Sequence, residues 1–241
     1  MKKLLILFAL LLTNFICKAQ VIKSLNPIVK EYDRCFSDEG AANYDKALKY
    51  IKDKGETNMS ESDWNYVQKL GYEEIYDSYF SLNGGGCSWY CGNGGPIKIT
   101  ASSRLNNQGN NNYNEKNLHD DYANTPWVEG VKGCGIGEWV EYTFKANNPR
   151  ITEIKIVNGY CKSYSAWKNN SRVKKLKLYI NGKSVALLNL EDTRCVQSFE
   201  ISPLTDSKQW TMRFEIVDVY KGDKWDDTAI SEIYFDGLDV H

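Results

Sequence analysis

Apolar and polar residues alternate with a period of two through the second half of the chain. The alternation is clearest in residues 138–144, 151–157 and 173–180, and shorter segments of the same kind cover 185–190, 195–201, 210–217 and 230–235. Such alternation puts every second side chain on one face of a strand, so each segment is predicted to be a strand with one buried face. Asn181-Gly182, between two of these segments, is typical of a two-residue hairpin turn. Many short strands separated by turns predict a mainly β fold, a β-sandwich of the jelly-roll kind.

The first half of the chain has a helical pattern instead. Apolar residues recur at helical spacing between Ala41 and Ile51, and Ser60 to Asp63 supply N-caps for a second helix. A glycine-rich stretch over 83–95 cannot continue a helix and marks a boundary. We therefore predict a small α-helical segment over 20–83, a Gly/Cys-rich linker over 84–96 and the jelly-roll domain over 97–241.

The chain begins with the pattern of a secretory signal. Lys2 and Lys3 precede an apolar run over residues 4–16, which is too short to span a membrane, and small residues at Cys17 and Ala19 suit signal peptidase. We expect residues 1–19 to be removed and the protein to be secreted or otherwise extracytoplasmic. The alternative is a lipoprotein signal in which Cys17 is acylated.

Removal of that signal changes the charge and the cysteine count. The full chain has 30 basic and 31 acidic residues, and losing Lys2, Lys3 and Lys18 leaves a net charge of −4, which does not suit a nucleic-acid binder. The cysteines that remain are an even number, which in an exported chain favours disulfides: Cys35, Cys87, Cys91, Cys134, Cys161 and Cys195. A zinc site at Cys87 and Cys91 is the competing interpretation.

Several motifs together resemble a known family. They cover residues 119–130, 135–141, 158–160, 170–176 and 218–232, in that order along the chain. They are similar to discoidin-like (factor V/VIII type C-like), galactose-binding-type jelly rolls, of the variety found as the translocation domain of bacterial NAD glycohydrolase toxins. The resemblance spans about residues 97–238 and implies the jelly-roll fold; it is less specific for a ligand, because one fold serves many functions.

The resemblance also implies a structural calcium ion. In related jelly rolls the opening loop and the last strand supply the ligands, which here are Asp120, Thr125, Ser231 through its carbonyl, and Glu232. Tyr122 departs from the pattern, since a polar ligand is expected at that position. The alternative is a turn without metal, in which Asp120 caps backbone amides.

Two loops combine aromatic rings with amides and charges, the mixture that binds sugars. Sugar C–H faces lie on aromatic rings while flanking polar groups take the hydroxyls. The candidate ligand-binding residues are Tyr160, Lys162, Trp167, Asn170, Arg172, Tyr220, Lys224, Trp225, Asp226 and Asp227. The sequence thus predicts a binding module for a glycan or cell-surface polysaccharide. The alternative for these loops is that they pack on each other, with Lys and Arg paired to the acids.

A different function is docking to a protein or membrane surface, as a toxin accessory or envelope-assembly part. The run from Ile154 to Leu190 has eight basic residues and no acid, although a solvated strand face has the same pattern. Catalysis is not predicted: Glu138 and Glu141 fall on opposite faces of one strand, and no activated serine accompanies His119 and Asp120. We therefore expect a protein that is not an enzyme.

Overall fold

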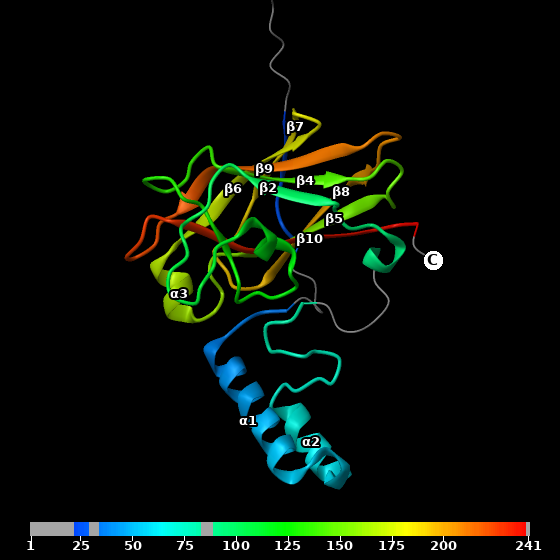
Figure 1. Ribbon diagram of the computed structural model, residues 1–241, viewed down its shortest axis with the longest axis vertical. Coiled ribbons are helices and arrows are strands. Elements are labelled where there is room, and N and C mark those ends of the chain that lie inside the picture. The colour runs from blue at the N-terminus through cyan, green and yellow to red at the C-terminus, as the bar shows by residue number, and fades with distance from the viewer. Residues whose placement is uncertain (1–21, 29–33, 83–88, 240–241) are drawn as a thin grey trace, which may run out of the picture.

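The computed structural model describes residues 22–28, 34–82 and 89–239. Its strands form a 10-stranded sheet that curls into two layers around the main apolar core (Figure 1). The strands are β1 (Lys23–Leu25), β2 (Lys98–Ala101), β3 (Trp127–Val128), β4 (Trp139–Phe144), β5 (Ile151–Asn158), β6 (Ser171–Ile180), β7 (Lys183–Asn189), β8 (Val196–Leu204), β9 (Trp210–Tyr220) and β10 (Thr228–Gly237). The predicted mainly β jelly-roll fold is confirmed.

Alternation along the strands builds the core as the sequence predicts. In β4 the side chains of Val140, Tyr142 and Phe144 are buried, and the residues that alternate with them are only half-buried. The same pattern runs along the first part of β9, which pairs antiparallel with β4. Each large apolar side chain removed from water in this way contributes about 1.5–3 kcal/mol, so the alternation fixes which face of each strand turns inward.

The strand order is β2-β4-β9-β6-β10-β5-β8, with β7 beside β6 and β3 beside β10. A short parallel contact joins the two layers: Ser171 and Arg172 of β6 lie opposite Thr228 and Ala229 of β10. This contact brings the start of β6 and the start of β10, with the loops before them, to one end of the sandwich. The predicted hairpin turn between β6 and β7 is confirmed, because Asn181 and Gly182 have φ values of 49° and 75°.

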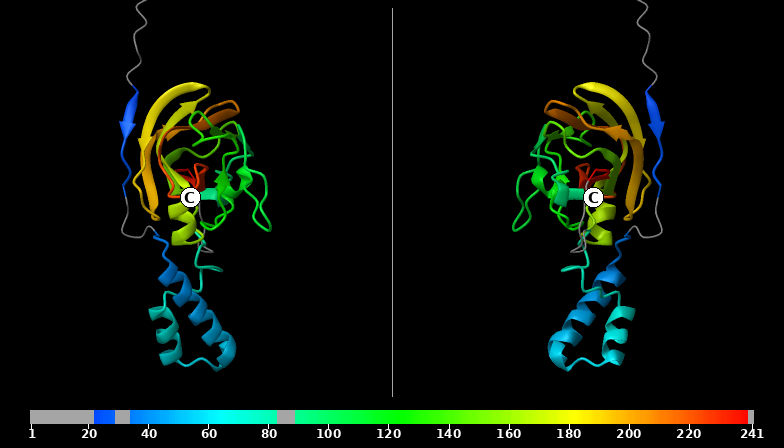
Figure 2. Two further views of the ribbon diagram at one scale, coloured as in Figure 1. Left: turned by 90° about the vertical axis from the view of Figure 1, so that its left-hand side faces the viewer. Right: turned by 90° about the vertical axis from the view of Figure 1, so that its right-hand side faces the viewer.

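Two helices form a hairpin that projects from the sandwich (Figures 1 and 2). Helix α1 (Asp38–Lys54) is capped by Ser37, and α2 (Glu61–Lys69) begins with a capping box between Ser60 and Asp63. The capping of α2 follows the predicted motif. In the described part of the chain, no helix is both long enough and apolar enough to cross a membrane.

The base of the hairpin is attached to the sandwich by covalent and polar links. A disulfide joins Cys35 to Cys195 at the start of β8, and Arg194 Nη1 donates to Asp38 Oδ1 at 2.9 Å. Arg34 donates to two carbonyl oxygens of the returning chain, those of Tyr79 and Ser81, at 2.7 Å each. These contacts fix the first turn of α1 to the sandwich, while the rest of the hairpin extends away from it.

The segment boundaries in the structure differ from those predicted by composition. Residues 23–25 form strand β1, which runs parallel to β7, so the helical segment is preceded by a strand of the sandwich. Trp89 is buried in the main core, and Tyr90 OH accepts a hydrogen bond from Phe235 N at 2.7 Å. The described end of the glycine-rich stretch therefore packs as part of the sandwich, because its aromatic side chains fill the core beneath β10.

Candidate functional site

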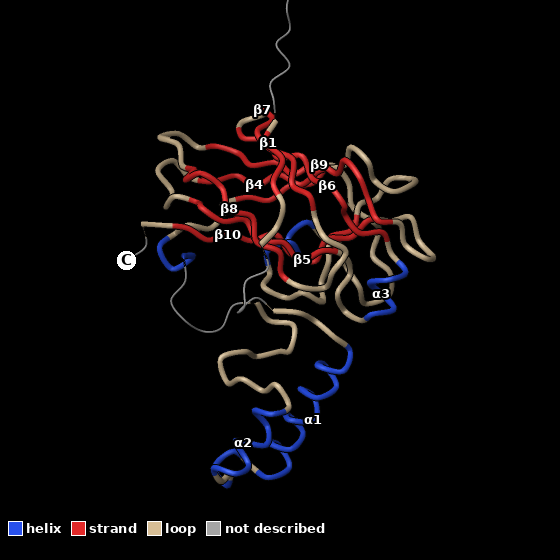
Figure 3. Tube along the Cα trace, turned by 180° about the vertical axis from the view of Figure 1, so that it is seen from behind, coloured by secondary structure: helices blue, strands red, loops and turns tan. Residues whose placement is uncertain are grey.

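A cavity of about 440 Å³ opens at the end of the sandwich where β6 and β10 begin. It lies among three segments: the asparagine-rich loop over residues 106–114 after β2, the turn and helix before β6, and the loop before β10. The helix is α3 (Tyr164–Asn169), which Figure 3 shows on the same side of the sandwich as α1. The lining residues are Leu105, Gln108, Tyr113, Val128, Tyr160, Ser163, Ser165, Ala166, Asn169, Asn170, Trp225 and Asp227.

Local sequence explains why α3 forms beside the cavity. Ser163 is in an extended conformation and its hydroxyl accepts from Ala166 N at 3.1 Å, which starts the helix. One turn later Trp167 is buried, and its Nε1 donates to the carbonyl of Asn158 at 3.0 Å. The helix ends at Asn169, whose carbonyl accepts from Trp225 N at 2.8 Å. The cavity's helix and the loop before β10 are therefore one hydrogen-bonded unit.

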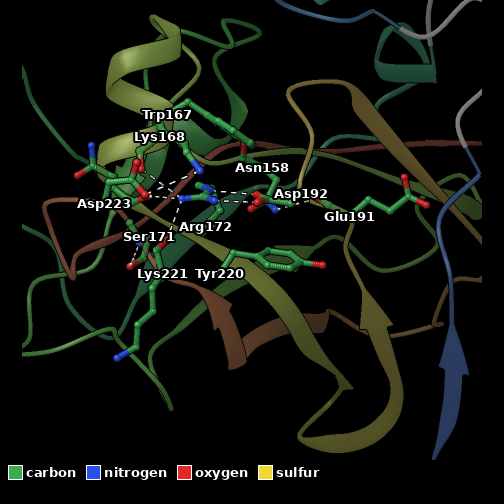
Figure 4. A network of polar contacts seen from close by, with 12 residues as sticks. Asn158, Trp167, Lys168, Ser171, Arg172, Glu191, Asp192, Tyr220, Lys221 and Asp223 are labelled. Atoms are coloured by element: carbon green, nitrogen blue, oxygen red, sulfur yellow. Dashed lines mark hydrogen bonds and ion pairs between the residues drawn. The ribbon is translucent and has the colours of Figure 1, made fainter.

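Arg172 is the centre of this unit (Figure 4). Its side chain is only 2% exposed, and it makes a bidentate contact with Asp192, at 3.0 Å from Nε and 2.8 Å from Nη2. Nη1 donates to carbonyl oxygens on both loops, at 3.0 Å to Asn170 and 3.2 Å to Lys221. The guanidinium also stacks on Trp167, with 4.6 Å between Cζ and the ring centroid. One buried cation thus holds three loops together.

The cavity wall has an aromatic side and a polar side. Tyr160 is 9% exposed and packs edge-on against Tyr113, with 6.3 Å between ring centroids. Burial raises the pKa of Tyr160 to about 12, so its hydroxyl stays protonated and available as a donor or acceptor. Trp225 is 48% exposed at the mouth, and burial raises the pKa of the nearby Asp227 carboxyl. An exposed ring beside amides and a carboxyl gives both kinds of contact that a sugar needs.

The structure divides the ten predicted ligand-binding residues into three groups. Those that line the cavity are Tyr160, Asn170, Trp225 and Asp227. Those that flank it are exposed side chains on the same loops: Lys162, Lys224 and Asp226. Those that support it from behind are Trp167, Arg172 and Tyr220, whose polar atoms are occupied by hydrogen bonds within the protein. A direct ligand contact by this third group would require breaking those bonds.

Several lining residues lie outside the ten predicted ones. Gln108 and Tyr113 come from the asparagine-rich loop, which is separated from α3 by about a third of the jelly-roll sequence. Its polar composition was the signal available in the sequence, but composition does not show which loops meet. Ser163 caps α3, and Ser165 and Asn169 belong to the helix.

The four predicted calcium ligands converge between the opening loop and β10. Thr125 Oγ1 donates to Asp120 Oδ2 at 2.8 Å, and Glu232 Oε1 accepts from the backbone N–H groups of Asp120 and Tyr122 at 3.2 and 3.1 Å. Ser231 Oγ lies 2.7 Å from the carbonyl oxygen of Ala123 and links the same loop to the strand. The convergence of loop and strand that the resemblance implied is therefore present in the fold.

The chemistry of this donor set fits a hard cation. Glu232 is fully buried, and its Oε2 has no hydrogen-bond partner. Burial raises the pKa of Glu232 well above its usual range, and the nearby Asp120 carboxyl raises it further; burial also raises the pKa of Asp120. Oxygen donors of this kind suit calcium, although no group of three or more acidic, His or Cys side chains arranged for a metal occurs among the residues described.

Tyr122 is turned away from these acids. Its hydroxyl donates to Asp77 Oδ2 at 2.5 Å, and the backbone around it bonds to the returning chain after α2, with Ala123 N donating to Phe80 O at 3.0 Å. Ser81 and Tyr122 form a short antiparallel bridge. The departure from the family pattern at this position thus serves the attachment of the helical segment.

The basic run between Ile154 and Leu190 lies beside acidic residues of the neighbouring strands once the strands are paired. Lys174 Nζ lies 3.3 Å from Asp218 Oδ2, and Lys177 of β6 is directly opposite Glu215 of β9. Neighbouring strands therefore offset much of the positive charge that is contiguous in sequence. This arrangement matches a solvated strand face better than a concentrated cationic patch.

The structure describes the bonding of some of the cysteines. Cys35 and Cys195 form the disulfide, whereas Cys134 and Cys161 are free thiols. Burial raises the pKa of the Cys161 thiol to about 12. Cys87 and the predicted secretory signal over 1–19 lie outside the described residues, as does the side chain of Cys91, so the signal, the zinc interpretation and the remaining pairings stay predictions.

The fold and the cavity define the protein as a β-sandwich domain with a candidate binding site at its loop end. The chain belongs to the family described as NAD glycohydrolase translocation F5/8 type C domain, whose model matches residues 89–236. The predicted family resemblance is thereby confirmed. A search of curated proteins finds no match.

The chain is also similar to solved carbohydrate-binding modules. One is CpGH89CBM32-5 from Clostridium perfringens, in complex with GalNAc-β-1,3-galactose, at 14% identity and a TM-score of 0.43 over 58% of this chain and 94% of that one. Another holds the CBM32-1 and CBM32-2 domains of Clostridium perfringens ZmpB, at 13% identity and a TM-score of 0.46 over 83% and 52% of the two chains. A third is the family 32 module of Streptococcus pneumoniae EndoD, at 11% identity and a TM-score of 0.41 over 58% and 96%.

Proposed function

We propose that the protein is a secreted, non-catalytic glycan-binding module and that the cavity between α3 and the loop before β10 is its binding site. The observation that carries the proposal is the half-exposed Trp225 ring at the mouth of a cavity lined by hydroxyl, amide and carboxyl groups. A sugar ring lying on Trp225 would turn its hydroxyls toward Asn169, Asn170 and Asp227. Loops positioned by a rigid scaffold are where binding sites of this kind occur.

The framework behind the cavity supports this role. Because Arg172 bonds to carbonyls of both loops, their separation is set before any ligand arrives. A preformed site loses little conformational entropy on binding. Extracytoplasmic location is part of the same proposal, since the disulfide between Cys35 and Cys195 suits an oxidising compartment.

We further propose that calcium binds between Asp120, Thr125 and Glu232, with the carbonyl of Ser231 as an additional ligand. The buried Glu232 oxygen without a hydrogen-bond partner supports this assignment. When bound, the ion would supply charge neutralisation for two facing carboxylates. Its role is structural, because the loop it would fix lies between the last strand and the returning chain of the helical segment.

A glycan array of neutral and anionic glycans tests the proposed function. The expected result is selective binding by the purified protein that is lost in the Trp225→Ala variant. Tyr66→Ala is a matched control, because Tyr66 is 47% exposed on α2, away from the cavity. Absence of binding across the array, or equal loss in both variants, would count against the proposal. Flotation with anionic liposomes that falls steeply with salt would favour surface docking instead.

A further inference from the structure

The helical hairpin carries the excess negative charge of the protein. Between residues 38 and 82 the sequence has ten acidic and five basic residues, whereas between 83 and 241 it has 19 of each. The sandwich is therefore balanced and the hairpin is acidic. A projecting element with charge of one sign attracts partners of the opposite sign and speeds their encounter.

A hollow of about 630 Å³ lies on this hairpin, at the end of α2 and the turn after it. It is lined by Trp64, Gln68, Tyr72, Glu73, Glu74 and Ile75. The rings of Trp64 and Tyr72 lie at 28° to each other with 6.4 Å between centroids. Ile75 is 58% exposed, although most isoleucine side chains in folded proteins are buried.

The lining chemistry favours a cation. Aromatic ring faces carry partial negative charge and attract ammonium and guanidinium groups. Glu73 and Glu74 are exposed at the same hollow, and no lysine or arginine is among its lining residues in the described chain. Burial, followed by the charges of Glu74 and Glu56, raises the pKa of Tyr72, which indicates a negative field around that ring.

The hairpin is held firmly enough to present this hollow. At its base, the Cys35–Cys195 disulfide, the Asp38–Arg194 ion pair and the Asp77–Tyr122 hydrogen bond all connect it to the sandwich. Beyond the base, α1 and α2 pack on each other through the buried residues Tyr44, Ala47 and Val67. Helix α2 lies at the end of the hairpin that is away from the sandwich, as Figures 1 and 2 show.

We infer that the Trp64–Glu74 hollow is a docking site for arginine or lysine side chains on a basic segment of a partner protein. The rings provide the apolar and cation–π contacts, and the two glutamates neutralise the incoming charge. This site is separate from the proposed glycan cavity, so the protein would join a glycan-bearing surface at one end to a basic protein at the other.

Fluorescence anisotropy with two labelled peptides tests this inference on the purified protein. One peptide alternates arginine with glycine, and the other replaces each arginine by citrulline, which has a similar shape but no charge. We expect the arginine peptide to bind at low salt with an affinity that weakens at about 150 mM salt. We expect the citrulline peptide to bind at least about tenfold more weakly, because it forms neither ion pairs nor cation–π contacts.

Two double variants locate the site. Glu73→Gln with Glu74→Gln is expected to weaken arginine-peptide binding about fivefold, since it removes two exposed ion pairs. Asp45→Asn with Glu61→Gln removes the same charge from exposed positions outside the hollow and should weaken binding less than about twofold. Trp64→Leu should weaken binding about threefold while retaining the salt dependence.

The outcomes separate this site from the glycan cavity. Trp225→Ala should leave peptide affinity unchanged. Equal binding of the two peptides, equal weakening by the two double variants, or no peptide binding at either salt concentration would each overturn the inference. The glutamine variants keep the test decisive if Trp64→Leu does not fold, because Glu73 and Glu74 are exposed.

Discussion

Replacing Arg172 by alanine is expected to destabilise the protein and to disorder the proposed glycan cavity. The guanidinium is 2% exposed and makes two hydrogen bonds to Asp192 and two close ones to loop carbonyls. Removing one partner of a buried ion pair costs about 3–5 kcal/mol. Asp192 is 34% exposed and regains water, so we expect a loss near 3 kcal/mol in the free energy of unfolding.

Urea unfolding followed by circular dichroism measures this loss. Arg172→Lys serves as the graded comparison: it keeps the charge near Asp192 but loses the planar fork that reaches both loops, and about half of the effect should remain. Arg213→Ala is a second control, because Arg213 pairs with Glu141 at 3.0 Å on a half-exposed strand face and should cost less than about 1 kcal/mol. A loss below about 1 kcal/mol for Arg172→Ala would refute the role assigned to this network.

Three further results are expected. Chelation of calcium should lower the melting temperature, with recovery on adding calcium but not magnesium and no response in Glu232→Gln; a melting curve indifferent to chelator would remove calcium from the account. Replacing both Cys35 and Cys195 by serine should cost about 2–5 kcal/mol in unfolding free energy, because the disulfide closes a sequence separation of 160 residues, and a loss too small to measure would contradict this. Burial raises the pKa of the Cys161 thiol to about 12, so at pH 8 this thiol should resist alkylation in the folded protein, whereas the less buried Cys134 should react. Mass spectrometry of the labelled peptides measures both, and faster labelling of Cys161 than of Cys134 would contradict its burial.

The strands were predictable because each has one buried face. In β4 and most of β9, alternation in sequence becomes alternation in burial without interference. The caps of α2 were equally local, since Ser60 and Asp63 contact each other within one turn. Features of this kind depend on neighbouring residues, and the sequence contains them directly.

The candidate site was less predictable because it depends on contacts distant in sequence. At the start of β6 three successive residues, Ser171, Arg172 and Val173, are all buried, since Val173 packs in the main core while Arg172 packs on Trp167 of α3. Alternation cannot predict that, and an arginine beside asparagines looked like a ligand contact. Tyr122 is a similar case: it appeared to spoil a metal site, whereas it bonds to Asp77 from the helical segment.

Isothermal titration of the strongest array ligand into the wild type and Trp225→Ala is the most direct test of the glycan-binding account. The Trp225 ring is 48% exposed, so its removal leaves the core intact, and stacking on such a ring is worth about 1–2 kcal/mol. The account predicts a Kd about five- to thirtyfold higher for Trp225→Ala, with an unchanged melting temperature and unchanged binding in Tyr66→Ala. Equal affinities in wild type and Trp225→Ala would contradict it.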